Sequence, residues 1–250
     1  MYKSERQTEI IALLKAEGYT TVEHLSKLLY TSPSSIRRDL IQLEKQGLVT
    51  RSYGGVELRK SNAKAITPFF TSVQHRVAEK RIIAEKAASL VQDKDIIFLD
   101  HSSTALFLAQ ELIKTKSITI MTNSIEVLSA MDTDHRISIY SCGGKVHKTK
   151  RCFVGEEATL QFRRLRADIA FFSCDALTAD GGIYADSWDD VLIREAMLKY
   201  AAKTACLCDS EKFGKSAGYN QCWLQDVDYL ISNVDCKDRY QHFSKELTIL

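Results

Sequence analysis

The chain has 250 residues, of which 45 % are hydrophobic and 26 % are charged. This composition excludes a disordered or fibrous protein, and the length suits one domain of about 150 to 200 residues together with a smaller one. The charge is uneven, because residues 1–60 carry ten Lys or Arg against seven Asp or Glu, whereas the other 190 residues carry 24 against 25. A basic segment joined to a near-neutral body weakly favours an anionic partner at the N-terminal end.

We expect neither a membrane-spanning segment nor a targeting segment in this chain. Apolar runs such as Ile96–Leu99 are far shorter than the roughly 20 residues that a membrane helix needs, and no apolar stretch of signal-peptide length follows the first residues. The seven cysteines form no Cys-x-x-Cys pair and no zinc-finger spacing with histidines. We therefore expect a soluble cytoplasmic protein with reduced thiols, no cofactor, no metal and no membrane partner.

The first 58 residues contain three helical segments and two short strand-like ones. Ser or Thr precedes each group of apolar residues spaced three and four apart, as at the start of amphipathic helices. The predicted helices cover residues 4–15, 22–29 and 33–46, and a hairpin of strands 48–52 and 56–58 follows them. The second helix is expected to bury Val22, Leu25, Leu28 and Leu29. Ser32 as the cap and Pro33 as the first helical residue favour the start of the third.

The third predicted helix has two faces of different chemistry. Ile36, Leu40 and Leu43 form one apolar stripe, and the opposite face carries hydroxyl, amide and guanidinium groups. Such groups bind phosphates and base edges, and small residues at its N-terminal end let a helix enter the major groove. The candidate DNA-binding residues are Ser34, Ser35, Arg37, Arg38 and Gln42, with Arg51 and Tyr53 from the hairpin. The alternative is a three-helix protein-interaction module whose charged face is only solvated.

These residues resemble the winged helix-turn-helix of the DeoR family of transcriptional regulators. The resemblance is carried by Ser34-Ser-Ile-Arg-Arg-Asp-Leu40 and by Leu43-Glu-Lys-Gln-Gly-Leu-Val-Thr-Arg-Ser-Tyr-Gly-Gly-Val56. In that family the pattern is Ser/Thr-Ile-Arg-Arg-Asp-Leu, then a Gly and an Arg-x-x-Gly-Gly wing. The match, from Arg6 to Glu57, implies that residues 1–58 form a domain that binds double-stranded operator DNA, with the helix-turn-helix pair near 20–39.

Residues 59–74 show no periodicity and include one of the two prolines, which predicts a linker. From residue 75 to residue 250, apolar strand-like runs alternate with helical segments. The runs are 95–99, 118–122, 136–141, 168–173, 204–208 and 227–231, and the helical segments include 104–113, 124–131 and 190–201. Continuous apolar strands separated by helices are typical of a mostly parallel sheet covered on both faces. We therefore predict an α/β chain whose larger domain is Rossmann-like.

Polar residues follow five of the predicted strands, at the edge where ligands of parallel sheets bind. Hydroxyls, amides, glycines, lysines and a few carboxylates recur there. Cations and helix N-terminal amides suit a phosphate, and acidic or amide groups suit hydroxyls, so this set favours a small phosphorylated polyol. A dinucleotide is not expected, because no Gly-x-Gly-x-x-Gly follows the first strand.

The second half is also similar to the sensor domain of the DeoR family, which resembles ribose-5-phosphate isomerase and binds a sugar-phosphate effector. The similar stretches are Ile96–Thr104, Thr122–Ser124, Gly143-Gly144, Phe153–Gly155 and Cys208–Phe213. The resemblance implies an effector site made of Asp100, Ser102, Ser103, Thr104, Thr122, Asn123, Ser124, Gly143, Gly144, Lys145, Arg151, Gly155, Asp175 and Lys212. Ser102, Ser173 and Ala176 stand where the family usually has Gly, which should narrow the pocket.

Two functions from different classes fit this organisation. The isomerases that the domain resembles have a Lys-Gly-Gly-Gly segment before an Arg-Glu pair, whereas this chain keeps Arg194-Glu195 but has Ala179-Asp-Gly-Gly182. The catalytic set is incomplete, so we predict a regulator rather than an enzyme: a repressor of a carbohydrate-metabolism operon, controlled by a phosphorylated sugar. The alternative is a sugar-phosphate isomerase-like enzyme that carries a DNA-binding module. Because one winged helix makes few contacts, we expect a homo-oligomer, either a dimer or a tetramer.

Overall fold

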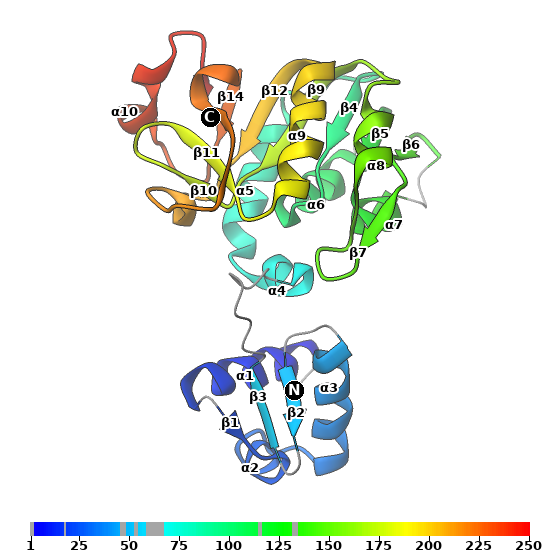
Figure 1. Cartoon of the computed structure of the whole chain (residues 1–250), viewed down its shortest axis with the longest axis vertical. Coiled ribbons are helices and arrows are strands. Elements are labelled where there is room, and N and C mark those ends of the chain that lie inside the picture. Colours follow the sequence, from blue (N-terminus) through cyan, green and yellow to red (C-terminus); the bar gives the residue numbers. More distant parts are fainter. Residues whose placement is uncertain are drawn as a thin grey trace. The chain divides into compact units, whose positions relative to one another are not determined.

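A computed structural model describes residues 3–17, 19–45, 49–52, 55–58, 68–114, 117–131 and 135–250. The chain forms two compact units, Met1–Pro68 and Phe69–Leu250, and Figure 1 shows the elements of each. The second unit begins within the stretch expected to be a linker, because Phe69–Gln74 forms helix α4 and the Phe69 side chain is buried. No helix among the described ranges is long and apolar enough to cross a membrane.

The first unit is a three-helix winged fold, as predicted. Its helices are α1 (Lys3–Glu17), α2 (Val22–Leu28) and α3 (Pro33–Lys45), and its antiparallel sheet has the order β1 (Tyr19–Thr20), β3 (Gly55–Leu58), β2 (Val49–Ser52). The short strand β1 was not predicted. Helix α1 begins one residue before Ser4, so Ser4 lies inside the helix and is not its cap.

The core of this unit confirms the predicted stripe of α3. Ile36, Leu40 and Leu43 are buried together with residues of α1, α2 and the sheet. The prediction for Leu28 is wrong, since its side chain is 44 % exposed, whereas Leu25 and the C-cap residue Leu29 are buried. Leu25 and Leu29 are four residues apart, so they lie on one face of the helix, and Leu28 lies beside that face.

The N-caps of α2 and α3 are the ones predicted from the sequence. Thr21 Oγ1 accepts a hydrogen bond from His24 N at 3.1 Å, and Ser32 Oγ accepts one from Ser35 N at 3.3 Å, directly before Pro33. These bonds satisfy N–H groups that a helix start leaves without partners. They fix where α3 begins, and therefore which of its residues face outward.

The second unit contains a seven-stranded sheet in which every pair of neighbours is parallel. The strand order is β15-β14-β12-β9-β4-β5-β6. The strands are β4 (Ile96–Leu99), β5 (Thr119–Thr122), β6 (Ser138–Ser141), β9 (Ala167–Ser173), β12 (Ala201–Leu207), β14 (Tyr229–Ile231) and β15 (Thr248–Ile249). The first six correspond to the predicted runs, which confirms the Rossmann-like α/β fold.

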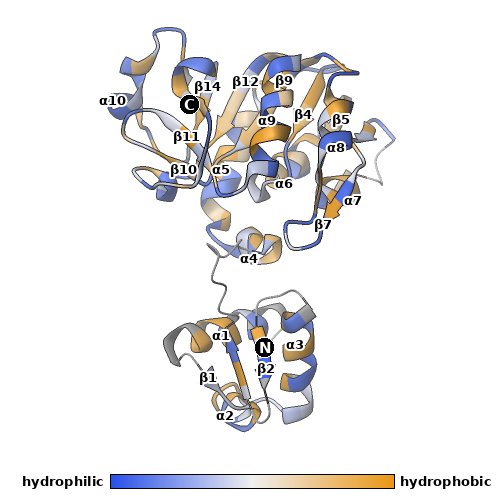
Figure 2. Ribbon diagram, in the orientation of Figure 1, coloured by the Kyte–Doolittle hydropathy of each residue, from blue (hydrophilic) through white to orange (hydrophobic). Residues whose placement is uncertain are grey.

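Helices cover both faces of this sheet. Helices α5 (Val77–Ala88), α6 (Ser103–Leu112) and α7 (Ile125–Met131) pack on the face that carries Ile97 and Leu99 of β4. Helices α8 (Glu156–Phe162) and α9 (Trp188–Tyr200) pack on the face that carries Phe98. Because both faces are covered, the central strands are mostly apolar, as Figure 2 shows for β4, β9 and β12.

Smaller elements surround the main sheet. The hairpin β7 (Lys145–His147) and β8 (Cys152–Val154) follows β6, and a second antiparallel sheet has the order β10 (Ala176–Leu177), β11 (Gly182–Ala185), β13 (Tyr219–Trp223). Short helical turns are η1 (Ser210–Lys212), η2 (Leu224–Asp226), α10 (Lys237–Tyr240) and η3 (Gln241–Phe243). All seven cysteines are buried free thiols.

Candidate functional site

The strand order places a switch point between β4 and β9 at the carboxyl edge of the large sheet. The chain runs outward from β4 through β5 to β6 and then returns to β9 on the other side of β4. Ligands of open α/β sheets bind in the crevice that forms at such a point. Asp100 directly follows β4, and Asp175 comes two residues after Ser173, the end of β9, so residues of the predicted effector site lie on either side of it.

Asp100 is fully buried at this switch point and is held by protein donors. Its Oδ1 accepts a hydrogen bond from Ser102 N, and its Oδ2 accepts one from Ser173 N, both at 2.9 Å. Arg194 Nη2 lies 3.0 Å from the same Oδ2, and Arg194 Nη1 donates to Gln221 Oε1 at 2.7 Å. Burial raises the pKa of Asp100, but the Arg194 charge and the donated bonds outweigh it and lower the pKa overall. Both oxygens are therefore paired with protein donors.

A second buried polar chain runs beside the first. Lys150 Nζ lies 2.5 Å from Asp190 Oδ2, and His101 Nε2 lies 3.5 Å from Asp190 Oδ1. The other ring nitrogen of His101 is 3.4 Å from Asn123 Nδ2. Although burial raises the pKa of Asp190, the neighbouring His101, Arg194 and Lys150 lower it to about 2. Burial lowers the pKa of His101, which favours its neutral form.

Two amide atoms at this edge are left for other partners. Asn123 Oδ1 and Gln221 Nε2 are buried, and neither has a hydrogen-bond partner among the residues that the structure describes. Asn123 Nδ2, by contrast, donates to Phe153 O at 3.1 Å, which fixes the orientation of the amide. A buried polar atom without a partner is costly, so both atoms are suited to bind a hydroxyl group or a water molecule.

Lys212 is carried by η1, the turn directly after β12, and reaches back to the end of β9. Its Nζ donates to Ser173 Oγ at 3.0 Å and also contacts the carbonyl oxygen of Cys174. The ammonium group thus lies at the edge between β9 and β12, next to Asp100, whose Oδ2 shares Ser173 as a partner. This position places a cation beside the switch point, as the phosphate hypothesis requires.

Hydroxyl residues of the predicted set stand at the starts of α6 and α7. Ser102 Oγ caps α6 by accepting from Ala105 N at 3.1 Å, and Ser124 Oγ accepts from Val127 N at 3.1 Å. Thr122 Oγ1 accepts from Ser124 N at 3.0 Å. The remaining two, Ser103 and Thr104, are buried in the first turn of α6. These hydroxyls therefore build the helix starts, whose N–H groups attract anions.

The predicted residues between β6 and α8 lie in and around the β7–β8 hairpin. Gly143 and Gly144 have φ of +62° and +100°, and a Cβ on Gly144 would lie 3.0 Å from the carbonyl oxygen of Val154. Gly155 has φ of +96° at the start of α8. Arg151 is paired with Glu126, with Nε to Oε1 at 2.7 Å, and Lys145 is exposed. The glycines are thus required by the backbone, whatever binds there.

The carboxylates at this edge are paired, not poised as bases. Asp100 and Asp190 each contact a cation, which stabilises their charged forms. Asp175 is exposed, and its Oδ2 accepts a hydrogen bond from Asp186 N at 2.9 Å. Glu195 is exposed on α9, facing away from buried Arg194. This arrangement suits binding of a polar anion better than proton abstraction from carbon.

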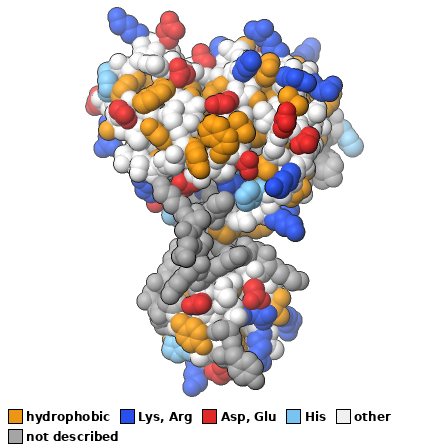
Figure 3. Space-filling view, in the orientation of Figure 1, with side chains coloured by type: hydrophobic (Ala, Val, Ile, Leu, Met, Phe, Trp, Pro, Cys, Tyr) orange, Lys and Arg blue, Asp and Glu red, His pale blue; other side chains and the backbone are white. Residues whose placement is uncertain are grey.

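In the first unit, α3 presents the predicted basic face to solvent. Ser34, Arg37 and Arg38 are exposed, and Ser35 is half-buried. Arg37 makes only a loose ion pair with Glu23 at 3.7 Å, and Arg38 has no hydrogen bond or ion pair with any described residue. Figure 3 shows Lys and Arg side chains on the side of this unit where α3 lies.

Three other candidate DNA-binding residues differ in placement. Gln42 Oε1 accepts a hydrogen bond from Gln7 of α1 at 2.9 Å. Arg51 is held by Glu44, with Nε to Oε2 at 2.7 Å. Tyr53 lies outside the described residues. Gln42 and Arg51 therefore have partners that they would have to exchange or share in order to contact DNA.

The buried charge network contains residues that sequence reasoning did not select. His101, Lys150, Asp190, Arg194 and Gln221 are all buried at the carboxyl edge. Asp190 and Arg194 are four residues apart, so they lie on one face of α9. The detectable signal is this pair of charges at helical spacing among apolar residues such as Val191 and Ile193. Tyr30, which is 97 % exposed and has φ of 47° in the turn before α3, is a further surface residue that was not considered.

Comparisons with known proteins match both units. A family described as "DeoR-like helix-turn-helix domain" matches residues 6–62, and one described as "DeoR C terminal sensor domain" matches residues 75–234. The chain is 30 % identical to the L-fucose operon activator of Escherichia coli, with 92 % of this chain and 95 % of the relative covered. It is also 30 % identical to the lactose phosphotransferase system repressor of Staphylococcus aureus, with 96 % of each covered.

The chain is less similar to solved structures such as the following than to the relatives above. Ribose 5-phosphate isomerase A from Neisseria gonorrhoeae is 18 % identical, with 54 % of this chain and 52 % of that chain covered and a TM-score of 0.41.

Proposed function

Because the chain belongs to the DeoR family of transcriptional regulators, we propose that it represses a carbohydrate-metabolism operon through α3 and releases it when a phosphorylated sugar binds at the carboxyl edge of the large sheet. The relatives named above are regulators, which confirms the prediction of a regulator over that of an isomerase-like enzyme. One of them is an activator and the other a repressor, so the direction of control belongs to the proposal.

The observation that carries the DNA-binding part is the exposed face of α3. Arg38 is exposed without a described partner, and Arg37 is held only loosely, so both guanidinium groups are available for phosphates or guanine. Below them, buried Ile36, Leu40 and Leu43 fix the helix to the core. A rigid helix with free cationic side chains matches what major-groove recognition requires. We expect this regulator to act in the cytoplasm, where its operator would lie.

The observation that carries the effector part is the set of groups at the switch point. Lys212 supplies a cation, the starts of α6 and α7 supply N–H groups, and Asn123 and Gln221 supply unpaired amide atoms. A phosphate would take the first two, and sugar hydroxyls would take the amides. The whole predicted set, from Asp100 to Lys212, is proposed to form this site, with Asp100 acting through the loop backbones that it holds.

We further propose that the chain works as a homo-oligomer. A single helix-turn-helix covers one half-site, and specific affinity in operators comes from two half-sites read by a symmetric dimer. A dimer or a tetramer would satisfy this requirement. Sedimentation of the full chain, alone and on DNA, measures which one forms.

The DNA-binding proposal is tested with a duplex selected by the full chain from a random-sequence pool. Arg38→Ala is expected to weaken binding to that duplex by at least about fivefold, since one bidentate contact contributes about 1–3 kcal/mol. Arg81→Gln, an exposed arginine on α5, is the matched control and should bind like wild type. Fluorescence anisotropy measures both. Equal affinity of Arg38→Ala and wild type would contradict the proposed role of α3.

A further inference from the structure

The corner formed by α4 and α5, residues Phe69–Lys80, touches three loops of the carboxyl edge. Phe69 N donates to Thr149 O at 3.1 Å, next to Lys150 and Arg151. Ser72 Oγ is 2.9 Å from Ser103 Oγ at the start of α6. His75 and Arg76, between the two helices of the corner, contact η1. In chain order, this corner is also the first described part of the larger unit after the DNA-binding unit.

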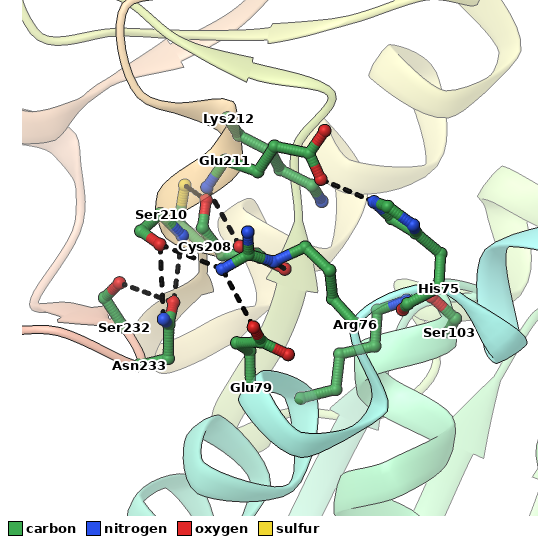
Figure 4. A network of polar contacts seen from close by, with 12 residues as sticks. His75, Arg76, Glu79, Ser103, Cys208, Ser210, Glu211, Lys212, Ser232 and Asn233 are labelled. Atoms are coloured by element: carbon green, nitrogen blue, oxygen red, sulfur yellow. Dashed lines mark hydrogen bonds and ion pairs between the residues drawn. The ribbon is translucent and has the colours of Figure 1, made fainter.

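The contact with η1 is made by two neighbouring residues of the corner, as Figure 4 shows. His75 Nε2 lies 2.5 Å from Glu211 Oε2, and Arg76 Nη2 donates to Ser210 Oγ at 3.2 Å. Arg76 Nε also lies 2.9 Å from Asp209 Oδ2, but without hydrogen-bond alignment, so that contact is a Coulombic one. The two corner residues therefore contact three consecutive residues directly before Lys212.

Arg76 adopts a backbone conformation that these contacts must maintain. Its φ and ψ are both 52°, in the left-handed region, at the N-cap of α5. A residue with a Cβ is disfavoured there and stays only where its surroundings hold it. Besides Asp209 and Ser210, the guanidinium group contacts Glu79 at 3.2 Å. Loss of the η1 contacts would leave this backbone conformation with much less support.

Other hydrogen bonds hold the corner together, so a substitution of Arg76 would mainly affect the contact between the corner and η1. Buried Lys80 donates from Nζ to the carbonyl oxygens of both Ser72 and His75, the latter at 2.7 Å. These bonds tie the end of α4 to the first turn of α5. On the other side of η1, Asn233 Oδ1 accepts from Ser210 N at 2.9 Å. Arg76 thus joins two elements that are each internally braced.

We propose that Arg76, supported by His75, is the residue that couples occupation of Lys212 to the orientation of the α4–α5 corner and so to DNA binding. The inference rests on the proposed function and identifies the residue through which effector binding changes DNA binding. The ammonium group of Lys212 ties η1 to the end of β9 through Ser173 and Cys174. An anion that binds this ammonium group competes with those contacts and frees η1 to shift. The movement changes the Asp209 and Ser210 contacts, and the strained backbone of Arg76 then relaxes. The start of α5 turns with it.

The test compares wild type, Arg76→Gln and Arg81→Gln as full chains. Each is titrated onto the selected duplex with and without hexose 1-phosphates, hexose 6-phosphates and pentose 5-phosphates, and melting temperatures are recorded with the same compounds. We expect the active sugar phosphate to change the DNA affinity of wild type and of Arg81→Gln by about tenfold, within the usual range of coupling between sites. In Arg76→Gln the change should be less than about twofold, while the compound still raises the melting temperature.

A change of DNA affinity as large in Arg76→Gln as in wild type overturns the inference and leaves the proposed function standing. If no compound changes the DNA affinity of wild type, the proposed function fails, and the inference fails with it. Should Arg76→Gln not fold, His75→Gln replaces it, because the His75 side chain is 61 % exposed and its loss spares the core. That variant should show a reduced response, and an undiminished one overturns the inference.

Discussion

At the scale of single residues, the most consequential feature is the pair of charges on the inner face of α9. Asp190 holds Lys150, and Arg194 holds Asp100, so α9 links the ends of β4 and β9 to the β7–β8 hairpin. Each carboxylate is buried, and each would be costly without its cation. The carboxyl edge is therefore shaped by side chains that come from a helix on one face of the sheet.

Removing the Asp190 carboxylate should destabilise the protein in a pH-dependent way. The folded pKa of about 2 lies below the unfolded value of about 3.9, so ionised Asp190 stabilises the fold above pH 4, and that contribution is lost as the pH falls toward 2. Asp190→Asn should lower the free energy of unfolding by about 3–5 kcal/mol at pH 7, because it leaves Lys150 buried without a counter-charge. Urea unfolding at pH 7, 4 and 3 measures the difference.

The difference from wild type should shrink as the pH falls below 4. The matched control is Asp189→Asn, the neighbouring and more exposed carboxylate of the same helix turn, which should unfold like wild type at each pH. A difference between Asp190→Asn and wild type that stays constant from pH 7 to pH 3 would mean that the Lys150 pair does not stabilise the fold as described.

The sequence predicts the polar residues at strand ends but not the residues that hold them. Asp100, Asn123 and Lys212 each follow an apolar run, so their position along a strand is visible without a structure. Arg194 of α9 reaches Asp100 from 94 positions along the chain, and Gln221 of β13 reaches Arg194 from 27 positions. No local pattern reports such a contact, because it is produced by the packing of α9 across the sheet.

At the scale of elements, η1 is the short turn on which the effector proposal depends. It carries Lys212 at its end, Asp209 as its cap, and the partners of His75 and Arg76 between them. Because these groups lie on four consecutive residues, Asp209 to Lys212, a shift of the η1 backbone displaces all of them. The turn was visible in the sequence only as polar residues after a strand.

Loss of the Lys212 ammonium group should remove sugar-phosphate binding. In Lys212→Met, the compound that raises the melting temperature of wild type should no longer do so, because a ligand stabilises only the state that it binds. Lys215→Met, in the same loop and paired with the same Glu211 that contacts His75, is the control and should keep the response. A response in Lys212→Met equal to that of wild type would place the phosphate elsewhere.

Several short elements were not predicted from the sequence. Strand β1 and strand β15 have two residues each, too few for any alternation of apolar and polar residues. Helix α4 was taken for linker because Phe69–Gln74 lacks a helical repeat, although Phe69 is buried. Long apolar strands and capped helices, by contrast, were placed to within a few residues, since their patterns extend over at least one full turn or pleat.

At the scale of the whole molecule, the chain joins a basic winged unit to a sensor unit through a short connecting segment. The first 60 residues carry ten Lys or Arg against seven Asp or Glu. This basic segment forms most of the unit in which α3 exposes Arg37 and Arg38. The larger unit has buried ion pairs at its carboxyl edge. A metabolite can control DNA binding in such a chain only by binding one arrangement of the units better than another.

The measurement that tests this account most directly is a structure of the full chain bound to its selected duplex. We predict that α3 lies in the major groove, with Arg37 and Arg38 within hydrogen-bond distance of phosphates or bases. A complex in which that face of α3 points to solvent or to another protein chain, and a different surface contacts the DNA, would contradict it.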